Sequence, residues 1–90
     1  MQLFINLFKI ISMKSWSIKN NRLCKSFHFQ DFKKALQFIN EIGKLSEELN
    51  HHPKITNLYN SVDIELWTHS ENKITSLDHA LASKIDKIKM

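Results

Sequence analysis

Histidines gather in one stretch of the chain. Three of the five, His51, His52 and His69, lie between residues 51 and 69. An imidazole titrates near pH ~6.5, so it can donate and accept protons at neutral pH. Two or three such groups around one pocket suit the loss of a hydroxyl group as water, coupled to proton removal from a nearby N–H or C–H. Dehydration is a reaction that needs this pair of proton transfers.

Metal binding is the alternative chemistry. Three histidines could supply nitrogen ligands, as in some zinc sites. Adjacent histidines rarely bind one ion, however, and the sequence contains no HxH or HxxxH motif. We therefore expect no metal ion. On residue types and spacing alone, ordinary surface histidines at loop ends remain an equally open interpretation.

A predicted helix over residues 31–49 leads to the first two histidines. Asp31 is a candidate N-cap, and apolar residues then recur at helical spacing. Gly43 lies inside this helix, where a close approach to a neighbouring strand would explain it. Pro53 follows the histidines and biases His52 away from helical angles, so both imidazoles are expected on a constrained bend.

Alternation of apolar and polar residues predicts four strands. A first hairpin is expected over 15–20 and 23–29, with Lys25 as an exception on its apolar face. A strand over 54–59 should end at Tyr59, with a tight turn at Asn60-Ser61. The run from 62 to 69 is the clearest strand. It directs one set of side chains to the helices and leaves another set on an open face.

The open face of that last strand carries Trp67 and His69. A closing helix is expected over 75–88, where Thr75 and Asp78 resemble a capping box. The element order is β-β-α-β-β-α. It predicts an α+β fold in two layers, a four-stranded antiparallel sheet with helices packed on one face.

Length and composition indicate one small soluble domain. The chain has 90 residues, a net charge of +4 and one cysteine, Cys24, which fits a reducing, cytoplasmic compartment. Acidic residues are interspersed with the basic ones, so we expect no nucleic-acid partner. Residues 15–90 are predicted to form the domain.

Residues 1–14 are predicted to be an N-terminal extension, with a short helix packing on the body as the first interpretation. The apolar run MQLFINLFKIISM is too short to span a bilayer and lacks the features of a signal peptide, so no membrane association is expected. Alternatively, translation in the cell starts at Met13, and the first twelve residues are not part of the protein.

A longer, ordered motif surrounds the histidines. Its parts are Glu47-x-x-x-His51-His52-Pro53, Tyr59-Asn60-x-Val62, Thr68-His69 and Asp78, preceded by Phe27-His28-Phe29-x-Asp31-Phe32-x-x-Ala35 and followed by Leu81-Ala82. This pattern resembles the pterin-4a-carbinolamine dehydratase family across residues 15–88. The resemblance implies a hydro-lyase that converts 4a-hydroxytetrahydropterin to quinonoid dihydropterin and water, in tetrahydropterin recycling, without a metal or organic cofactor.

The resemblance also implies roles for individual residues. His51 and His69 would be the acid and base, and His52 would bind and orient the pterin. The other expected substrate-site residues are Glu47, Asn50, Trp67, Thr68, Ser70 and Asp78. Among them, Glu47 and Asp78 would each orient a histidine, although Asp78 reads equally well as a helix cap.

The chain departs from the family pattern next to the histidines. Lys54 and Ile55 stand where the family often has an acid and a large aromatic residue, and Asn50 replaces a common aspartate. Fewer acids make the pocket less negative, and the lost aromatic loosens stacking on the pterin.

Other functions stay open at the level of sequence. Like the family, the chain is expected to form a homodimer or homotetramer. A non-catalytic oligomeric interaction module of the same fold is the alternative function. Binding of single-stranded nucleic acid on the open sheet face, with Trp67 stacking on a base, is the third, but Asp63 and Glu65 on that face would repel phosphates.

Overall fold

The computed structural model describes residues 15–90, so the predicted N-terminal extension lies outside the described residues. The elements are β1 (Ser17–Lys19), β2 (Arg22–His28), α2 (Phe32–Leu49), β3 (Lys54–Leu58), β4 (Ser61–Leu66) and α3 (Ser76–Asp86). The predicted α+β order is confirmed. Within residues 15–90, no helix is long and apolar enough to cross a membrane.

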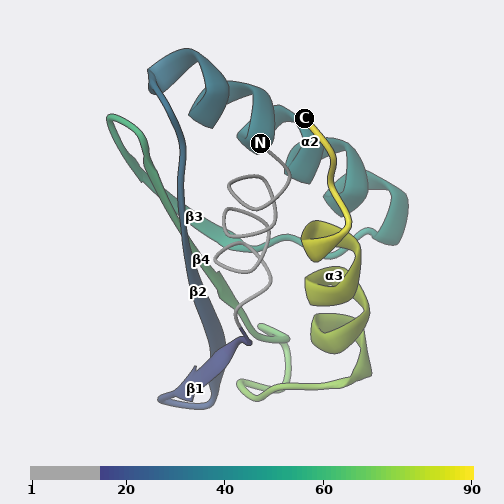
Figure 1. Cartoon of the computed structure of the whole chain (residues 1–90). Helices are drawn as coiled ribbons and strands as arrows, with labels where there is room; N and C mark the ends of the chain where they lie inside the picture. The colour runs from purple at the N-terminus through teal and green to yellow at the C-terminus, as the bar shows by residue number, and fades with distance from the viewer. Residues whose placement is uncertain (1–14) are drawn as a thin grey trace.

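The four strands form one antiparallel sheet in the order β1-β2-β4-β3. Figure 1 shows α2 and α3 together on one side of this sheet, with the opposite side left open. Sheet and helices thus make the two predicted layers. The pairing of β2 with β4 matters most for the site, because it fixes where β4 ends, at the register pair Leu23↔Leu66.

The core lies between the sheet and the two helices. Alternate residues of β2 and β4 point into it, as period-two patterning requires. They meet apolar residues that recur at helical spacing on α2 and α3. The buried set is Leu23, Phe27, Val62, Ile64 and Leu66 from the strands, with Ala35, Phe38, Ile42, Leu81, Ala82 and Ile85 from the helices.

Lys25 breaks the apolar pattern of β2 for a structural reason. Its side chain is 3% exposed, and its Nζ lies 2.8 Å from Oδ1 of Asp86 on α3. The Trp16 indole N–H donates to Oδ2 of the same carboxylate at 3.0 Å. A buried charge needs such a partner, so Lys25 ties β2 to the end of α3.

Turn positions differ slightly from the predicted ones. The β1–β2 turn uses Asn20 and Asn21 at positive φ, as expected. The β3–β4 turn lies at Tyr59-Asn60 rather than at Asn60-Ser61, with Tyr59 at φ 51°. The Asn57 amide sets this shape by donating to the carbonyls of Tyr59 and Ser61. Tyr59 is exposed on this turn and is not a packing residue.

Several predicted elements are shorter in the structure. β1 covers Ser17–Lys19 instead of 15–20, and β3 ends at Leu58 instead of Tyr59. β4 ends at Leu66 instead of 69, because its pairing with β2 stops at Leu23↔Leu66, one residue from the start of β2 at Arg22. Thr68 instead pairs across its own loop with Lys73. α3 ends at Asp86 rather than 88.

Gly43 does not have the close strand contact suggested by the sequence. A Cβ built at this position meets no atom within 4 Å. Glycine in a helix interior costs ~1 kcal/mol relative to alanine. The described residues therefore give no steric reason for glycine at this position.

We expect Gly43→Ala to raise the free energy of unfolding by ~0.5–1 kcal/mol, because it removes backbone freedom from the unfolded chain without a clash. Urea unfolding followed by circular dichroism measures the change. Gln37→Ala, an exposed helix position with similar propensities, should change little. A destabilised Gly43→Ala protein would mean that this face contacts something beyond residues 15–90 of one chain.

Candidate active site

The His51-His52-Pro53 bend begins where α2 is stopped. Asn50 adopts a left-handed conformation (φ 49°, ψ 45°), which asparagine tolerates better than most residues. Its N–H donates to the Glu47 carbonyl at 3.3 Å, and the His51 N–H donates to the Ser46 carbonyl at 3.0 Å. These bonds close the helix, so Asn50 has a clear structural role as its C-cap. The turn directs His51 inward and His52 outward.

His51 is buried against the first turn of α3. Its Nε2 lies 2.5 Å from Oδ1 of Asp78, and the Asp78 side chain is fully buried. An ionised carboxylate only accepts hydrogen bonds, so Nε2 carries a proton, and in the neutral ring the lone pair is on Nδ1. Nδ1 makes no bond among the described residues, and none of their buried side-chain nitrogen or oxygen atoms lacks a partner. Within residues 15–90, Nδ1 is therefore available to accept a proton.

The Asp78 carboxylate also binds the loop after β4. Oδ2 accepts from the Thr68 hydroxyl and from the Thr75 N–H, each at 2.9 Å. The single hydroxyl proton of Thr68 goes to Asp78, so the Thr75 hydroxyl, 2.6 Å away, must donate to Thr68. Asp78 thus fills both roles left open by the sequence: it caps α3 and it holds a histidine.

Burial and hydrogen bonding act in opposite directions on Asp78. Burial raises its pKa, but the hydrogen bonds from His51, the Thr75 backbone and Thr68 outweigh it and hold the pKa below its ordinary value of 3.8. The carboxylate therefore stays ionised at neutral pH, which keeps the His51 Nε2 proton in place.

The second histidine of the bend makes a separate pair at the surface. His52 Nε2 lies 2.7 Å from Oε2 of Glu47, with the two side chains 52% and 79% exposed. Glu47 therefore contacts His52, not His51. An exposed pair of this kind stabilises little, but it sets the direction of the ring that it holds.

His69 belongs to the turn that follows β4. The ring is exposed and lies against Trp67, with centroids 4.6 Å apart and planes at 44°. Thr68, between these two residues, is buried and bonded to Asp78, so the same carboxylate links the loops of His51 and His69. Ser70 is exposed in the same turn.

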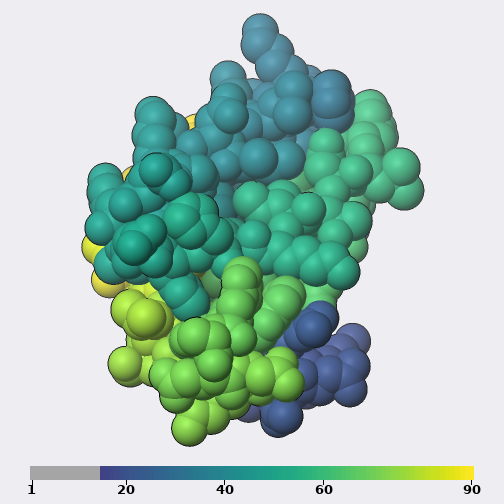
Figure 2. Space-filling model, turned by 180° about the vertical axis from the view of Figure 1, so that it is seen from behind, coloured from purple at the N-terminus to yellow at the C-terminus, as the bar shows by residue number. Residues whose placement is uncertain are grey.

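Figure 2 views the molecule from behind and shows these segments bordering each other on one face. The teal surface around residue 50 meets the green surface around residue 70. The structure thus brings the predicted site residues to one region, made by the end of α2, the turn after β4 and the start of α3. Among residues 15–90, no group of three or more His, Cys, Asp or Glu side chains is arranged to hold a metal ion.

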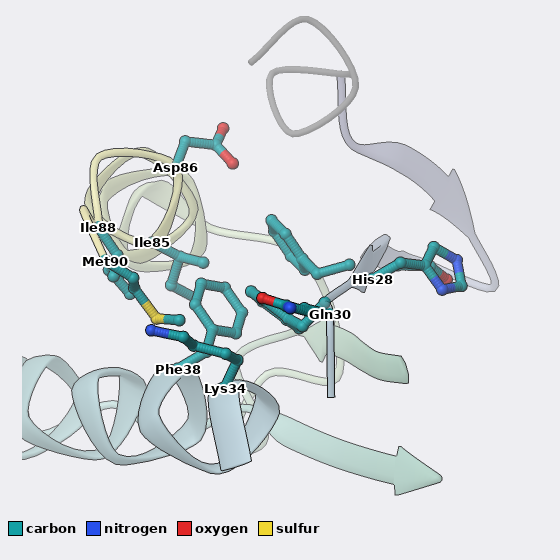
Figure 3. A pocket seen from close by; sticks show the side chains of 11 residues that line it. His28, Gln30, Lys34, Phe38, Ile85, Asp86, Ile88 and Met90 are labelled. Carbon is teal, nitrogen blue, oxygen red and sulfur yellow. The ribbon is translucent and has the colours of Figure 1, made fainter. Parts of the chain in front are cut away.

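A well-formed cavity lies elsewhere, between the start of α2, the end of β2 and the residues after α3. Its volume is about 290 Å³, and its walls include Phe27, Phe38 and Ile85. Figure 3 shows His28, its one histidine, directed away from the apolar side chains. His28 instead meets Ser61 through Nδ1 at 3.2 Å. The cavity therefore contributes none of the predicted site residues.

Comparison with known proteins decides the family. Residues 6–88 match the family profile described as pterin 4 alpha carbinolamine dehydratase. The chain belongs to this family. A provisionally named pterin-4-alpha-carbinolamine dehydratase of Sulfurisphaera tokodaii is 45% identical over 76 residues, which cover 84% of this chain and 82% of that protein. One from Prochlorococcus marinus strain NATL2A is 43% identical over 74 residues, covering 82% and 78%.

Solved structures of family members share the fold. A Brucella melitensis protein described as a transcriptional coactivator/pterin dehydratase has a TM-score of 0.78 at 34% identity, covering 96% of this chain and 93% of that one. A pterin dehydratase-like protein identified as a RuBisCO assembly factor in the alpha-carboxysome has a TM-score of 0.70 at 27% identity, covering 83% and 89%. Proteins that share this fold thus have more than one described function.

Sequence reasoning missed two parts of the site. Thr75 was recognised as a helix cap but not as the hydrogen-bond donor to Thr68. Arg22, 45 positions before Trp67, has its guanidinium carbon 3.9 Å from the centre of the indole ring. No local pattern signals either contact, because both depend on how separate loops meet.

We expect Asp78→Asn to lower the free energy of unfolding at pH 7 by ~2–3 kcal/mol, since it weakens hydrogen bonds to a buried charge. The folded-state pKa of Asp78 is lowered, so its stabilisation is present above pH 3.8 and is lost as the pH falls through the folded value. The difference between wild type and Asp78→Asn should therefore shrink below about pH 4.

Urea unfolding at pH 7 and at pH 3 to 4 measures this difference. Asp63→Asn is the matched control, because Asp63 is exposed on the open sheet face. It should change stability little at either pH. An Asp78→Asn deficit that stays constant down to pH 3 would contradict the assignment of Asp78 as an ionised, hydrogen-bonded group.

Proposed function

We propose that the protein is a 4a-hydroxytetrahydropterin dehydratase, a hydro-lyase that releases water and quinonoid dihydropterin. The observation that carries the proposal is the His51–Asp78 pair, which leaves Nδ1 of His51 without a partner among residues 15–90 and is joined through Asp78 to the His69 loop. Membership of the family supports the choice of a pterin as substrate. The reaction would serve tetrahydropterin recycling in the cytoplasm.

The chemistry requires two proton transfers. The C4a–O bond breaks as the hydroxyl group gains a proton and leaves as water. The neighbouring ring N–H loses its proton, and its electron pair forms the new C=N bond. The elimination is redox-neutral, so acid and base groups suffice and no cofactor is assigned.

His51 and His69 are the acid and base in this proposal. His51 suits proton acceptance because Asp78 fixes its tautomer with the Nδ1 lone pair free. His69, exposed on the turn and in contact with Trp67, would then donate the proton to the leaving hydroxyl. This assignment of roles rests on the tautomer that Asp78 fixes in His51.

The surrounding residues would bind and orient the pterin. His52, held by Glu47, is placed to contact the ring from the solvent side. Asn50, Trp67, Thr68 and Ser70 would border it through main-chain groups of the two loops. Asp78 is fully buried and would act through His51 rather than by touching the substrate.

Lys54 and Ile55, which depart from the family pattern, lie on opposite faces of the sheet. Lys54 Nζ lies 3.6 Å from Oε2 of Glu65, so its charge is directed to the open sheet face. Ile55 pairs with Ile64 on the helix-facing side of the sheet. We propose that these substitutions alter the strength of pterin binding and leave the histidine pair intact.

We expect His51→Ala and His69→Ala each to lower the dehydration rate by ~10²–10⁴-fold, the usual contribution of a positioned acid or base. His52→Ala should mainly raise KM. The assay follows loss of 4a-hydroxytetrahydropterin, generated in situ, against the uncatalysed rate. His28→Ala, at the opposite end of β2 from the site, should retain wild-type turnover. Unchanged rates in both catalytic variants would exclude this mechanism.

An assembly role is the second candidate function, and we propose that the chain forms a homodimer or homotetramer. The observation in its favour is on α2, which exposes Phe32 (46%) and Leu36 (41%) one turn apart. Large contiguous apolar patches often mark interaction surfaces, and these two neighbouring side chains would be the centre of such a patch. The RuBisCO assembly factor shares this fold.

We expect Leu36→Glu to convert the oligomer to a smaller species, because a charge there would have to be buried on association. Light scattering after size-exclusion chromatography measures the mass. Lys33→Glu, an exposed position of the first helical turn, is the control for charge alone. A wild-type protein that is monomeric at high concentration would refute this self-association. If the wild-type protein also dehydrated the pterin no faster than the uncatalysed rate, an interaction with another protein would become the leading function.

A further inference from the structure

A continuous set of side-chain contacts crosses the open face of the sheet. We name it the surface belt and define it as Lys54, Glu65, Arg22, Trp67 and His69. Arg22 Nη1 lies 3.2 Å from Oε1 of Glu65, and Lys54 Nζ lies 3.6 Å from Oε2. Arg22 then contacts Trp67, which contacts His69. The belt therefore connects the strand that follows the His-His-Pro bend to the turn of His69.

Arg22 is placed in the belt by its own hairpin. Asn20 and Asn21, both at positive φ, form the turn that starts β2 at Arg22. Next to it, Leu23 pairs with Leu66, the last residue of β4. The guanidinium thus reaches the first residue beyond β4, which is Trp67.

Trp67 and His69 need side-chain contacts to fix their directions. Trp67 follows the last ladder pair of β4, so no strand partner constrains it. The backbone of Thr68 is held by Lys73 and its hydroxyl by Asp78. His69 projects from this fixed point as an exposed side chain, and its described side-chain contact is with Trp67. The direction of the imidazole therefore depends on where the indole lies.

We propose that Arg22 is a positioning residue for His69 and acts through Trp67. This inference rests on the proposed dehydratase function for its kinetic consequence, but the geometry that it describes is independent of that function. Arg22 holds the indole by a cation–π contact at 3.9 Å while Glu65 holds the guanidinium. The indole in turn restricts the rotamers of His69.

Arginine is the residue suited to this place. Its planar guanidinium can stack on an aromatic ring and pair with a carboxylate at the same time. Lysine can keep the ion pair with Glu65 but presents a point charge rather than a flat group. Arg22→Lys therefore separates stacking from charge.

The test measures the His69 ring and the kinetics in the same proteins. The indole ring current of Trp67 shifts the imidazole proton resonances of His69 in NMR spectra. Arg22→Ala should move these resonances toward those of an exposed histidine. It should also lower kcat by about 2- to 5-fold, the size of one exposed cation–π contact, with a smaller change in KM. Arg22→Lys should give smaller changes of the same sign.

Lys19→Ala is the matched control. Lys19 is the register partner of Arg22 on β1, carries the same charge and lies on the same face of the sheet. It should leave the His69 resonances and kcat unchanged. Unmoved His69 resonances in folded Arg22→Ala or Arg22→Lys, or an equal effect of Lys19→Ala, would overturn the proposal. If wild type lacks dehydratase activity, the proposed function fails, while the His69 resonances still decide the positioning role.

Discussion

A fully buried negative charge is tolerated only where hydrogen bonds replace its lost water, and Asp78 meets this condition with three donors. The donors come from the end of α2, the turn after β4 and the start of α3. Separating any of these segments would leave the buried carboxylate short of a hydrogen bond, which costs free energy, so the three segments stay in one arrangement. His51 is fixed in position and tautomer as part of the same requirement.

The two histidine loops are connected on both sides of the sheet plane. On the helix side, Asp78 bonds to His51 and Thr68. On the open side, Glu65 pairs with Lys54 and with Arg22, which contacts Trp67. The buried connection restricts the backbone of the turn, whereas the surface connection acts on side-chain direction. The proposed proton transfer would need both, because small errors in placement reduce the rate of a reaction strongly.

Family membership narrows the function without deciding it alone. The family fold is shared by a protein described as a coactivator/pterin dehydratase and by a RuBisCO assembly factor. In this chain the histidine–carboxylate pair is intact, and α2 also exposes Phe32 and Leu36. The proposed catalytic histidines and the exposed apolar residues of α2 lie on different surfaces, so the two proposed roles are compatible within one protein.

Local patterning determined the elements, because apolar periodicity and the signals of Asp31, Pro53 and the paired asparagines act within a few residues. The motif around His51, His52 and His69 also predicted which residues form the candidate site. Only the tertiary structure decided the partners: Asp78 with His51, Glu47 with His52, and Arg22 with Trp67. Two of these pairs join segments more than 20 residues apart. Their geometry depends on where the pairing of β4 with β2 stops and on the hydrogen bonds that the buried Asp78 carboxylate requires. Neither constraint can be read from neighbouring residues.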